Sequence, residues 1–101
     1  MPTTPKVLFR GAATTSVGTT LYTTPTATTT IVSSIAITNT AASAGTFTLG
    51  LDAVLFADAV AIAADSTIII DLKQVLVATD TITGGASATS INFHISGVEI
   101  V

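Results

Sequence analysis

The sequence predicts an all-β protein: a single antiparallel β-sandwich, of jelly-roll or immunoglobulin-like type, with an extended N-terminal arm. Three observations lead to this prediction. Short runs rich in β-branched residues alternate between apolar and polar positions, which is the two-residue period of a strand. Turn-forming residues separate these runs, and no segment has a convincing helical period. A chain of 101 residues is long enough for one domain with one core.

The N-terminal part of the chain is expected to lie outside the sandwich. Met1–Pro5 contains two prolines, which favours an extended arm without internal hydrogen bonds. Lys6–Arg10 is compatible with a short strand, and Gly11–Gly18 is small and polar, as in a loop. We therefore divide the chain into an N-terminal arm and loop, residues 1–18, and a β-sandwich domain, residues 19–101.

The strongest strand signal is Thr28–Asn39. Ile31, Ile35 and Ile37 fall on one face of this strand, which we expect to pack on the core, while small and mixed residues fall on the other. Thr19–Thr24, just before it, predicts a shorter strand.

Further strands are expected on both sides of a turn at Asp52-Ala53. In Thr46–Asp52, Phe47 and Leu49 face inward. Alanine disfavours the positive φ of a two-residue type I′ turn, so we expect a turn of three or more residues before the next strand begins. Ala57–Ala64 fits a helix by alanine propensity and a strand by its branched residues; we favour the strand.

The remaining segments alternate between strands and turns. Ser66–Leu72 predicts a strand, with Ile70 among its core residues, and Asp71–Gln74 is compatible with one helical turn. Thr81–Thr83 is a short strand, and Gly84–Ala88 reads as a flexible loop. The last strand is expected from Thr89 onward, with Ile91, Phe93 and Ile95 facing inward.

The apolar positions of the last strand change phase at Ser96-Gly97. Up to Ile95 they are odd-numbered, whereas Val98 and Ile100 are even-numbered. We expect a β-bulge or bend at Ser96-Gly97 that keeps Val98 and Ile100 on the apolar side. The alternative is a straight strand, with Glu99 on the inward face and Val98 and Ile100 packed on a neighbouring subunit.

The composition excludes several classes of partner. The net charge is −3, and only 9% of the residues are charged. Three scattered cations do not line a nucleic-acid groove or form a polybasic membrane patch, so we expect neither partner. A mean hydropathy of +0.78 is high for a small soluble domain and predicts a homotrimer or another symmetric oligomer.

No catalytic, cofactor-binding or metal-binding residues are expected, and we do not expect an enzyme. The chain has no cysteine, which excludes disulfides and zinc–thiolate sites. Its single histidine, His94, has no partner in sequence that would orient it as a base. The aspartates are spaced as turn formers rather than grouped as calcium ligands.

Several runs resemble a group of small tailed-phage virion proteins. The likeness covers Leu21–Val101 and implies a β-sandwich used in capsid decoration or in tails and fibres, without transferring any site residue. Ala53 departs from the pattern, which has glycine after Asp52. The runs are Leu-Tyr-Thr-Thr-Pro, Ile-Val-Ser-Ser-Ile-Ala-Ile-Thr-Asn-Thr, Leu-Gly-Leu-Asp, Asp-Leu-Lys-Gln-Val-Leu, Asp-Thr-Ile-Thr-Gly and Ile-Ser-Gly-Val-Glu-Ile.

The expected function is therefore that of a non-enzymatic capsid decoration, or cement, protein that binds the major capsid protein. The alternative is a tail or neck component that contacts a tail protein, or a fibre domain that attaches the particle to a host glycan. The N-terminus has no apolar signal core, so we expect synthesis in the host cytoplasm and incorporation into the virion. Expected interface residues are Val7, Leu8, Phe9, Arg10, Val98 and Ile100.

Overall fold

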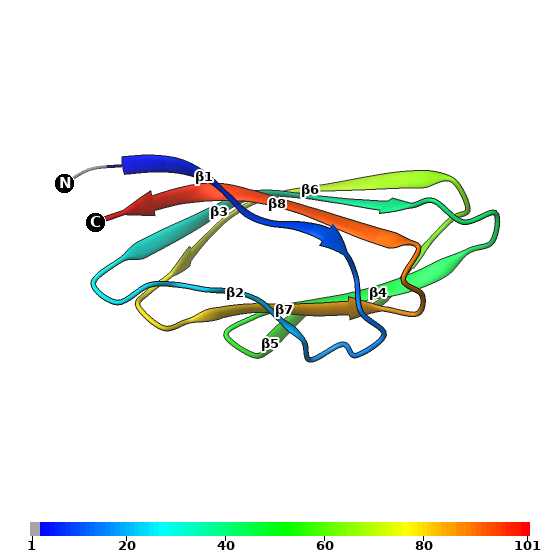
Figure 1. The fold of residues 1–101 in the computed structure, drawn as a ribbon, viewed down its shortest axis with the longest axis horizontal. Coiled ribbons are helices and arrows are strands. Elements are labelled where there is room, and N and C mark those ends of the chain that lie inside the picture. The colour runs from blue at the N-terminus through cyan, green and yellow to red at the C-terminus, as the bar shows by residue number, and fades with distance from the viewer. Residues whose placement is uncertain (1–2) are drawn as a thin grey trace.

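The computed structural model describes residues 3–101 as eight strands in two antiparallel sheets that pack face to face (Figure 1). Sheet A has the order β1-β8-β3-β6, and sheet B has the order β2-β7-β4-β5. The strands are β1 (Thr3–Ala12), β2 (Thr20–Thr23), β3 (Thr29–Asn39), β4 (Gly45–Leu51), β5 (Val54–Ile62), β6 (Ser66–Leu76), β7 (Thr81–Ala86) and β8 (Ile91–Ile100).

The strand pairing is nested. β1 pairs with β8, β2 with β7, β3 with β6 and β4 with β5. The first half of the chain, β1–β4, thus pairs antiparallel with the second half, β5–β8, as in one long hairpin. The pairs β1-β8 and β3-β6 belong to sheet A, and β2-β7 and β4-β5 belong to sheet B. This is the jelly-roll arrangement. The predicted β-sandwich is confirmed, and the topology is the jelly-roll of the two types considered.

The first strand is part of the sandwich rather than an arm beside it. Met1 and Pro2 lie outside the described residues, but Thr3–Pro5 pair with the end of β8 in regular register. Leu8 and Ala13 belong to the core. The described part of the expected arm is thus an edge strand, because prolines are tolerated at a sheet edge, where one side of the strand needs no ladder hydrogen bonds.

The core lies between the two sheets and is built from alternate residues of the strands. Phe47 of sheet B and Phe93 of sheet A meet edge to face, with ring centroids 6.5 Å apart. Of the residues expected to face the core, all are buried except Ile70, which is half-buried on the edge strand β6, and Ile31, which lies on the outer face. The fully buried large apolar side chains are Val32, Ile35, Ile37, Phe47, Leu49, Ile62, Leu76, Ile82, Ile91, Phe93 and Ile95.

The expected bulge at Ser96-Gly97 is wrong, and the alternative straight strand is correct. Pairing continues through Gly97, and no glycine among residues 3–101 has positive φ. The extra residues lie instead in the strands on both sides, between Val7 and Phe9 in β1 and between Val32 and Ser34 in β3. A Cβ at Gly97 would overlap the carbonyl oxygen of Ile31, so glycine is required by its bulged neighbours.

The bulge in β3 also changes which residues of that strand face the core. Val32 is buried before the bulge, and Ile35 and Ile37 are buried after it. Ile31, expected on the inward face, therefore lies on the outer face of sheet A, opposite Val98 of β8. Strict alternation along a strand assigns side chains to the correct face only as far as an inserted residue, because the insertion reverses the assignment beyond it.

The hairpin between β4 and β5 is tighter than expected. Leu51 pairs with Val54, so the turn has only two residues, Asp52 and Ala53, with φ of 51° and 64°. Both angles match a type I′ turn, which suits the twist of the flanking strands. The expectation of a longer turn is wrong, because strand pairing holds Ala53 in a conformation that alanine alone disfavours.

Two other local expectations are also corrected. Asp71–Gln74 forms no helical turn, because β6 continues through it to Leu76. The loop expected at Gly84–Ala88 is wrong for its first three residues, because β7 extends to Ala86; Ser87 and Ala88 lie in the connection to β8, which begins at Ile91. A Cβ at Gly85 would overlap the backbone of Ser16, so this glycine permits close packing of a loop on the strand.

Replacing Gly97 by alanine should destabilise the fold by roughly 2 kcal/mol or more, because the added Cβ has no space between β1 and β3. Denaturant unfolding of Gly97→Ala measures the loss. Gly18→Ala is the matched control, since a Cβ there would meet nothing within 4 Å. Equal stability of the two variants would contradict the account of Gly97.

Ala53→Gly should stabilise the protein by about 1 kcal/mol, because glycine adopts the left-handed conformation of this turn without a steric cost. Thermal unfolding should show a higher midpoint. Ala42→Gly is the control, an exposed loop residue outside the left-handed region. A midpoint lowered by both changes would show that Ala53 is not strained.

Candidate functional site

The most distinctive surface feature is an apolar groove on the side of the sandwich where β5 and β6 lie. These strands are the outer strands of different sheets. The groove has a volume of about 340 Å³ and falls within the size range of ligand and peptide pockets. It is lined by Leu51, Val54, Leu55 and Phe56 from the β4–β5 hairpin and by Ile70, Leu72 and Gln74 from β6.

Irregular pairing of β5 accompanies this groove. The register of β5 against β4 shifts twice, between Phe47 and Leu49 and again between Leu49 and Gly50. Ala59 has a φ of 50°, and its N–H donates to the Thr48 hydroxyl at 3.0 Å, so the bulge is satisfied by a side chain. Bulges bend an edge strand and increase its twist, which fits an open side between β5 and β6.

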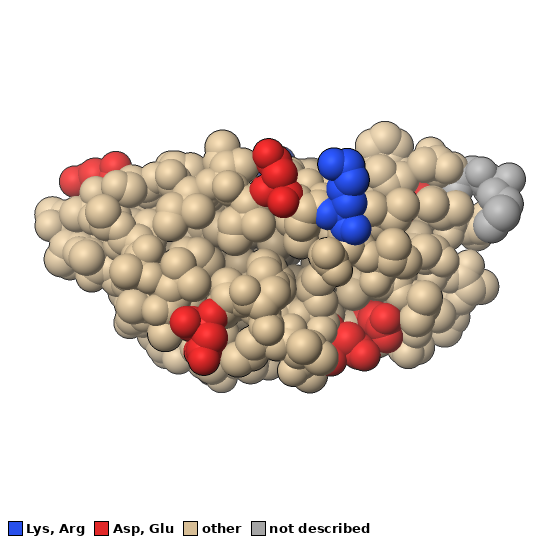
Figure 2. Space-filling model, turned by 180° about the vertical axis from the view of Figure 1, so that it is seen from behind, with Lys and Arg blue, Asp and Glu red and all other residues tan. Residues whose placement is uncertain are grey.

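Exposed apolar side chains gather on the same side. Of the ten large apolar residues that are exposed in residues 3–101, seven lie on β5, on β6 or directly after β6. Figure 2, seen from behind, shows a surface that is mostly uncharged, with a few separate acidic groups and a basic side chain near the centre. The seven residues are Val54, Leu55, Phe56, Val60, Ile69, Val75 and Val77.

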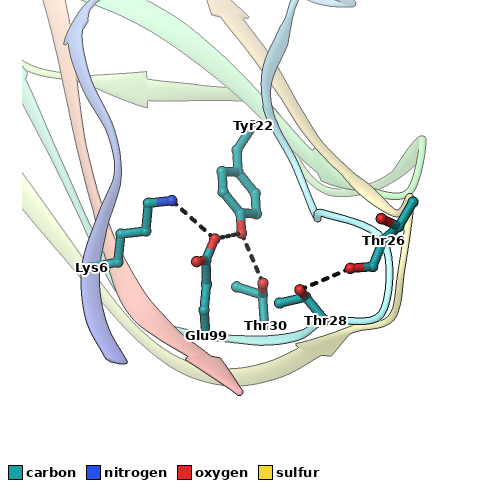
Figure 3. Close-up of polar contacts among 6 residues, drawn as sticks. All are labelled: Lys6, Tyr22, Thr26, Thr28, Thr30 and Glu99. Carbon is teal, nitrogen blue, oxygen red and sulfur yellow. Dashed lines mark hydrogen bonds and ion pairs between the residues drawn. The ribbon is translucent and has the colours of Figure 1, made fainter. Parts of the chain in front are cut away.

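A cluster of polar side chains joins the two sheets near the chain termini (Figure 3). The Tyr22 hydroxyl of β2 donates to Glu99 Oε2 of β8 at 2.5 Å, and Lys6 Nζ of β1 donates to the same oxygen at 3.2 Å. Since the phenol proton is directed at Glu99, the Thr30 hydroxyl of β3 donates to the Tyr22 oxygen at 2.8 Å. This arrangement follows from the straight course of β8, which turns Glu99 inward.

The cluster perturbs both of its acidic groups. The hydrogen bond from Tyr22 holds the pKa of Glu99 below its ordinary value against the opposing effect of burial, and Lys6 contributes in the same direction as Tyr22. Burial raises the pKa of Tyr22 above its ordinary value, and the hydrogen bond to Glu99 adds to this. Both shifts favour an ionised carboxylate bound by a neutral phenol, so the cluster can act as a polar connection between the sheets.

The structure separates the six residues expected at an interface into two groups. Val7, Arg10, Val98 and Ile100 lie on the outer face of sheet A, where the register aligns them with exposed or half-buried neighbours. Leu8 is 7% exposed and belongs to the core, and Phe9 packs against the core. The bulge in β1 turns these two side chains inward.

His94 follows the buried Phe93 in β8 and therefore lies on the outer face of sheet A. Its neighbours there are Arg10 of β1 and Ala36 of β3. Residues 3–101 contain no group of three or more histidine, cysteine, aspartate or glutamate side chains arranged to hold a metal ion. Within the same range, no helix has the length and apolarity needed to cross a membrane.

The groove and the polar cluster were both missed from the sequence. The groove depends on which strands become edges, and the cluster joins residues as far apart as Tyr22 and Glu99. One signal was present: Glu99 is the only charged residue between His94 and the C-terminus, and a straight last strand turns it inward.

Comparison of the chain with protein-family models, with curated proteins and with solved structures gave no match.

Tyr22→Phe should lower the free energy of unfolding at neutral pH by about 1–3 kcal/mol, because the Glu99 carboxylate loses its shortest donor. The pKa of Glu99, followed by NMR titration, should rise toward its ordinary value. Thr38→Val is the control, since it removes an exposed hydroxyl pair with Thr67 and should leave Glu99 unchanged.

The pH dependence of the wild-type protein follows from the same two groups. The folded-state pKa of Glu99 is lowered, so its stabilisation is present above about pH 4.3 and is lost as the pH falls through the folded pKa. The folded-state pKa of Tyr22 is raised, so its contribution is present below about pH 10 and is lost as the pH rises through the folded pKa. Tyr22→Phe should flatten both limbs, and identical pH profiles would contradict the assignment.

Proposed function

We propose that this protein is a non-enzymatic structural component of a phage particle, a capsid decoration protein that binds the major capsid protein as a symmetric homo-oligomer. The observation that carries the proposal is the extent of apolar surface left exposed, with Val54 and Ile69 at 70% and 68%. Exposed apolar surface of this kind marks a protein whose surface is completed by partners. The jelly-roll topology supports the same proposal, because viral capsid domains also use it.

The outer face of sheet A is the proposed contact with the particle. Val98 lies in register between Pro5 of β1 and Ile31 of β3, which makes an apolar row across three strands. Ile100 continues the apolar surface along β8, and Val7 of β1, two residues from Pro5 and opposite Ser96, is 44% exposed. Such a row on an antiparallel face presents side chains at strand spacing to a flat partner.

The experiment that tests this proposal adds purified protein to particles that lack it and measures the copies bound by electron microscopy and quantitative gel analysis. Saturation at a fixed ratio to the major capsid protein supports a decoration protein. A few copies at a tail, neck or fibre would favour the alternative component instead. Absence of any particle binding would overturn the proposal.

Val98→Asp should reduce particle occupancy at least tenfold at a fixed protein concentration, because it places a carboxylate in the centre of the apolar row. The variant should keep its β-sheet circular dichroism, since Val98 faces away from the core. Val17→Asp is the matched control, as Val17 is 50% exposed in the loop before β2. Equal occupancy of the two variants would show that this face does not contact the particle.

A further inference from the structure

The edge of sheet A formed by β6 is long, and its side chains alternate between half-buried and exposed from Ser66 to Lys73. Its pairing with β3 shifts register once, between Asp71 and Gln74. β6 spans eleven residues and pairs only with β3 among the described strands. Ile70, Leu72 and the exposed Gln74 line the groove, and Ile69, Asp71, Lys73 and Val75 on the other face of the strand are all exposed. Such an edge presents a row of free backbone groups to which another extended strand can pair.

The exposed side chains of β6 are self-complementary about Leu72. When two antiparallel copies of a strand pair around one residue, residues at equal distances on either side of it face each other. Around Leu72, Asp71 faces Lys73 of the second copy, and Lys73 faces Asp71. One step further out, Ile69, 68% exposed, faces Val75, 58% exposed.

We propose that β6 binds the β6 of a second copy of this chain, antiparallel and centred on Leu72, so that two sheets A join across a two-fold axis. Charge complementarity favours a second copy as the occupant of this edge, because two identical strands in this register form two ion pairs between Asp71 and Lys73. Cross-strand partners on one face lie about 4.5–5.5 Å apart at Cβ, close enough for oppositely charged side chains to interact.

Neighbouring registers are excluded by the same side chains. Centring the pair on Asp71 or on Lys73 places two like charges directly opposite each other, which is destabilising. Centring it between two residues would set the groove face of one strand against the outer face of the other. Leu72 is therefore the centre that satisfies both charge and face.

The pairing also accounts for the groove. On the inner face, Leu72 meets Leu72 of the second copy, and Ile70 meets Gln74. Because β5 and β6 lie on one side of the sandwich, the open side of each groove faces the other copy across the axis. Exposed Leu55 and Phe56 at the groove then lie at the contact rather than in water.

This inference rests on the symmetric self-association within the proposed function and names its surface. The first experiment uses the absence of cysteine from the chain. Oxidised Leu72→Cys should form a disulfide-linked dimer, because only a residue on the axis faces its own copy at a distance that a disulfide spans. Ile68→Cys is the matched control on the same face, since the two copies of residue 68 lie about 27 Å apart along the strand.

The second experiment exchanges charges and is read by sedimentation equilibrium. Asp71→Lys should raise the dimer dissociation constant about tenfold or more, because both ion pairs become repulsive. The double variant Asp71→Lys, Lys73→Asp should restore wild-type association, because the pairs are rebuilt with signs reversed. Asp58→Lys, an equal change of charge on exposed β5, is the control and should have a smaller effect.

Cross-linking at residue 72 with rescue by the exchanged pair supports the interface. A monomer at all concentrations, a trimer that ignores the charge changes, or equal cross-linking at residues 68 and 72 would overturn it. The particle assay separates the two proposals. If the protein decorates particles but does not associate through β6, the proposed function stands and this interface is wrong. If it dimerises through β6 but binds no particle, the interface stands and the proposed function is wrong.

Discussion

The packing of Gly97 between β1 and β3 sets the geometry of sheet A. Both neighbouring strands carry an extra residue at this row, and the carbonyl of Ile31 and the side chain of Leu8 fill the space of a Cβ. Because the neighbours bulge, β8 needs no insertion and keeps one face inward as far as Glu99. The hydrogen bond from Tyr22 that joins the sheets at this end therefore depends on a backbone constraint in the middle of the last strand.

The parts of the fold that were predictable from the sequence are those decided by period. Ile35, Ile37 and Ile95 are buried as the alternation of their strands indicated, because neighbours in regular register preserve it. The phase change at Gly97 correctly indicated an inserted residue, but we assigned that residue to β8. The inserted residue lies next to Val32 in β3, and Gly97 is the position in β8 that this neighbouring bulge crowds. A single strand does not reveal whether it or its neighbour carries the extra residue.

The candidate site was less predictable, because it depends on long-range arrangement. The groove exists because β5 and β6 end their respective sheets on one side, and strand order is not encoded in the period of either strand. Ala53 and Ala59 show the same limit for backbone conformation: both have positive φ, which local propensity disfavours but pairing with β4 imposes. Tertiary contacts thus override local preference where the sheet is most irregular.

The two edge strands beside the groove differ in how they meet other chains. β5 has two register shifts and a left-handed residue at Ala59, and bulges of this kind turn an edge away from further pairing. β6 has one register shift, between Asp71 and Gln74, and no residue with positive φ. It carries one acidic and one basic residue, Asp71 and Lys73, on either side of Leu72. Charges on an edge strand repel most apolar strands, but this arrangement presents opposite charges to an identical strand in antiparallel register. Asp71 and Lys73 thus limit which strands can pair with the side of the sandwich that exposes the most apolar surface.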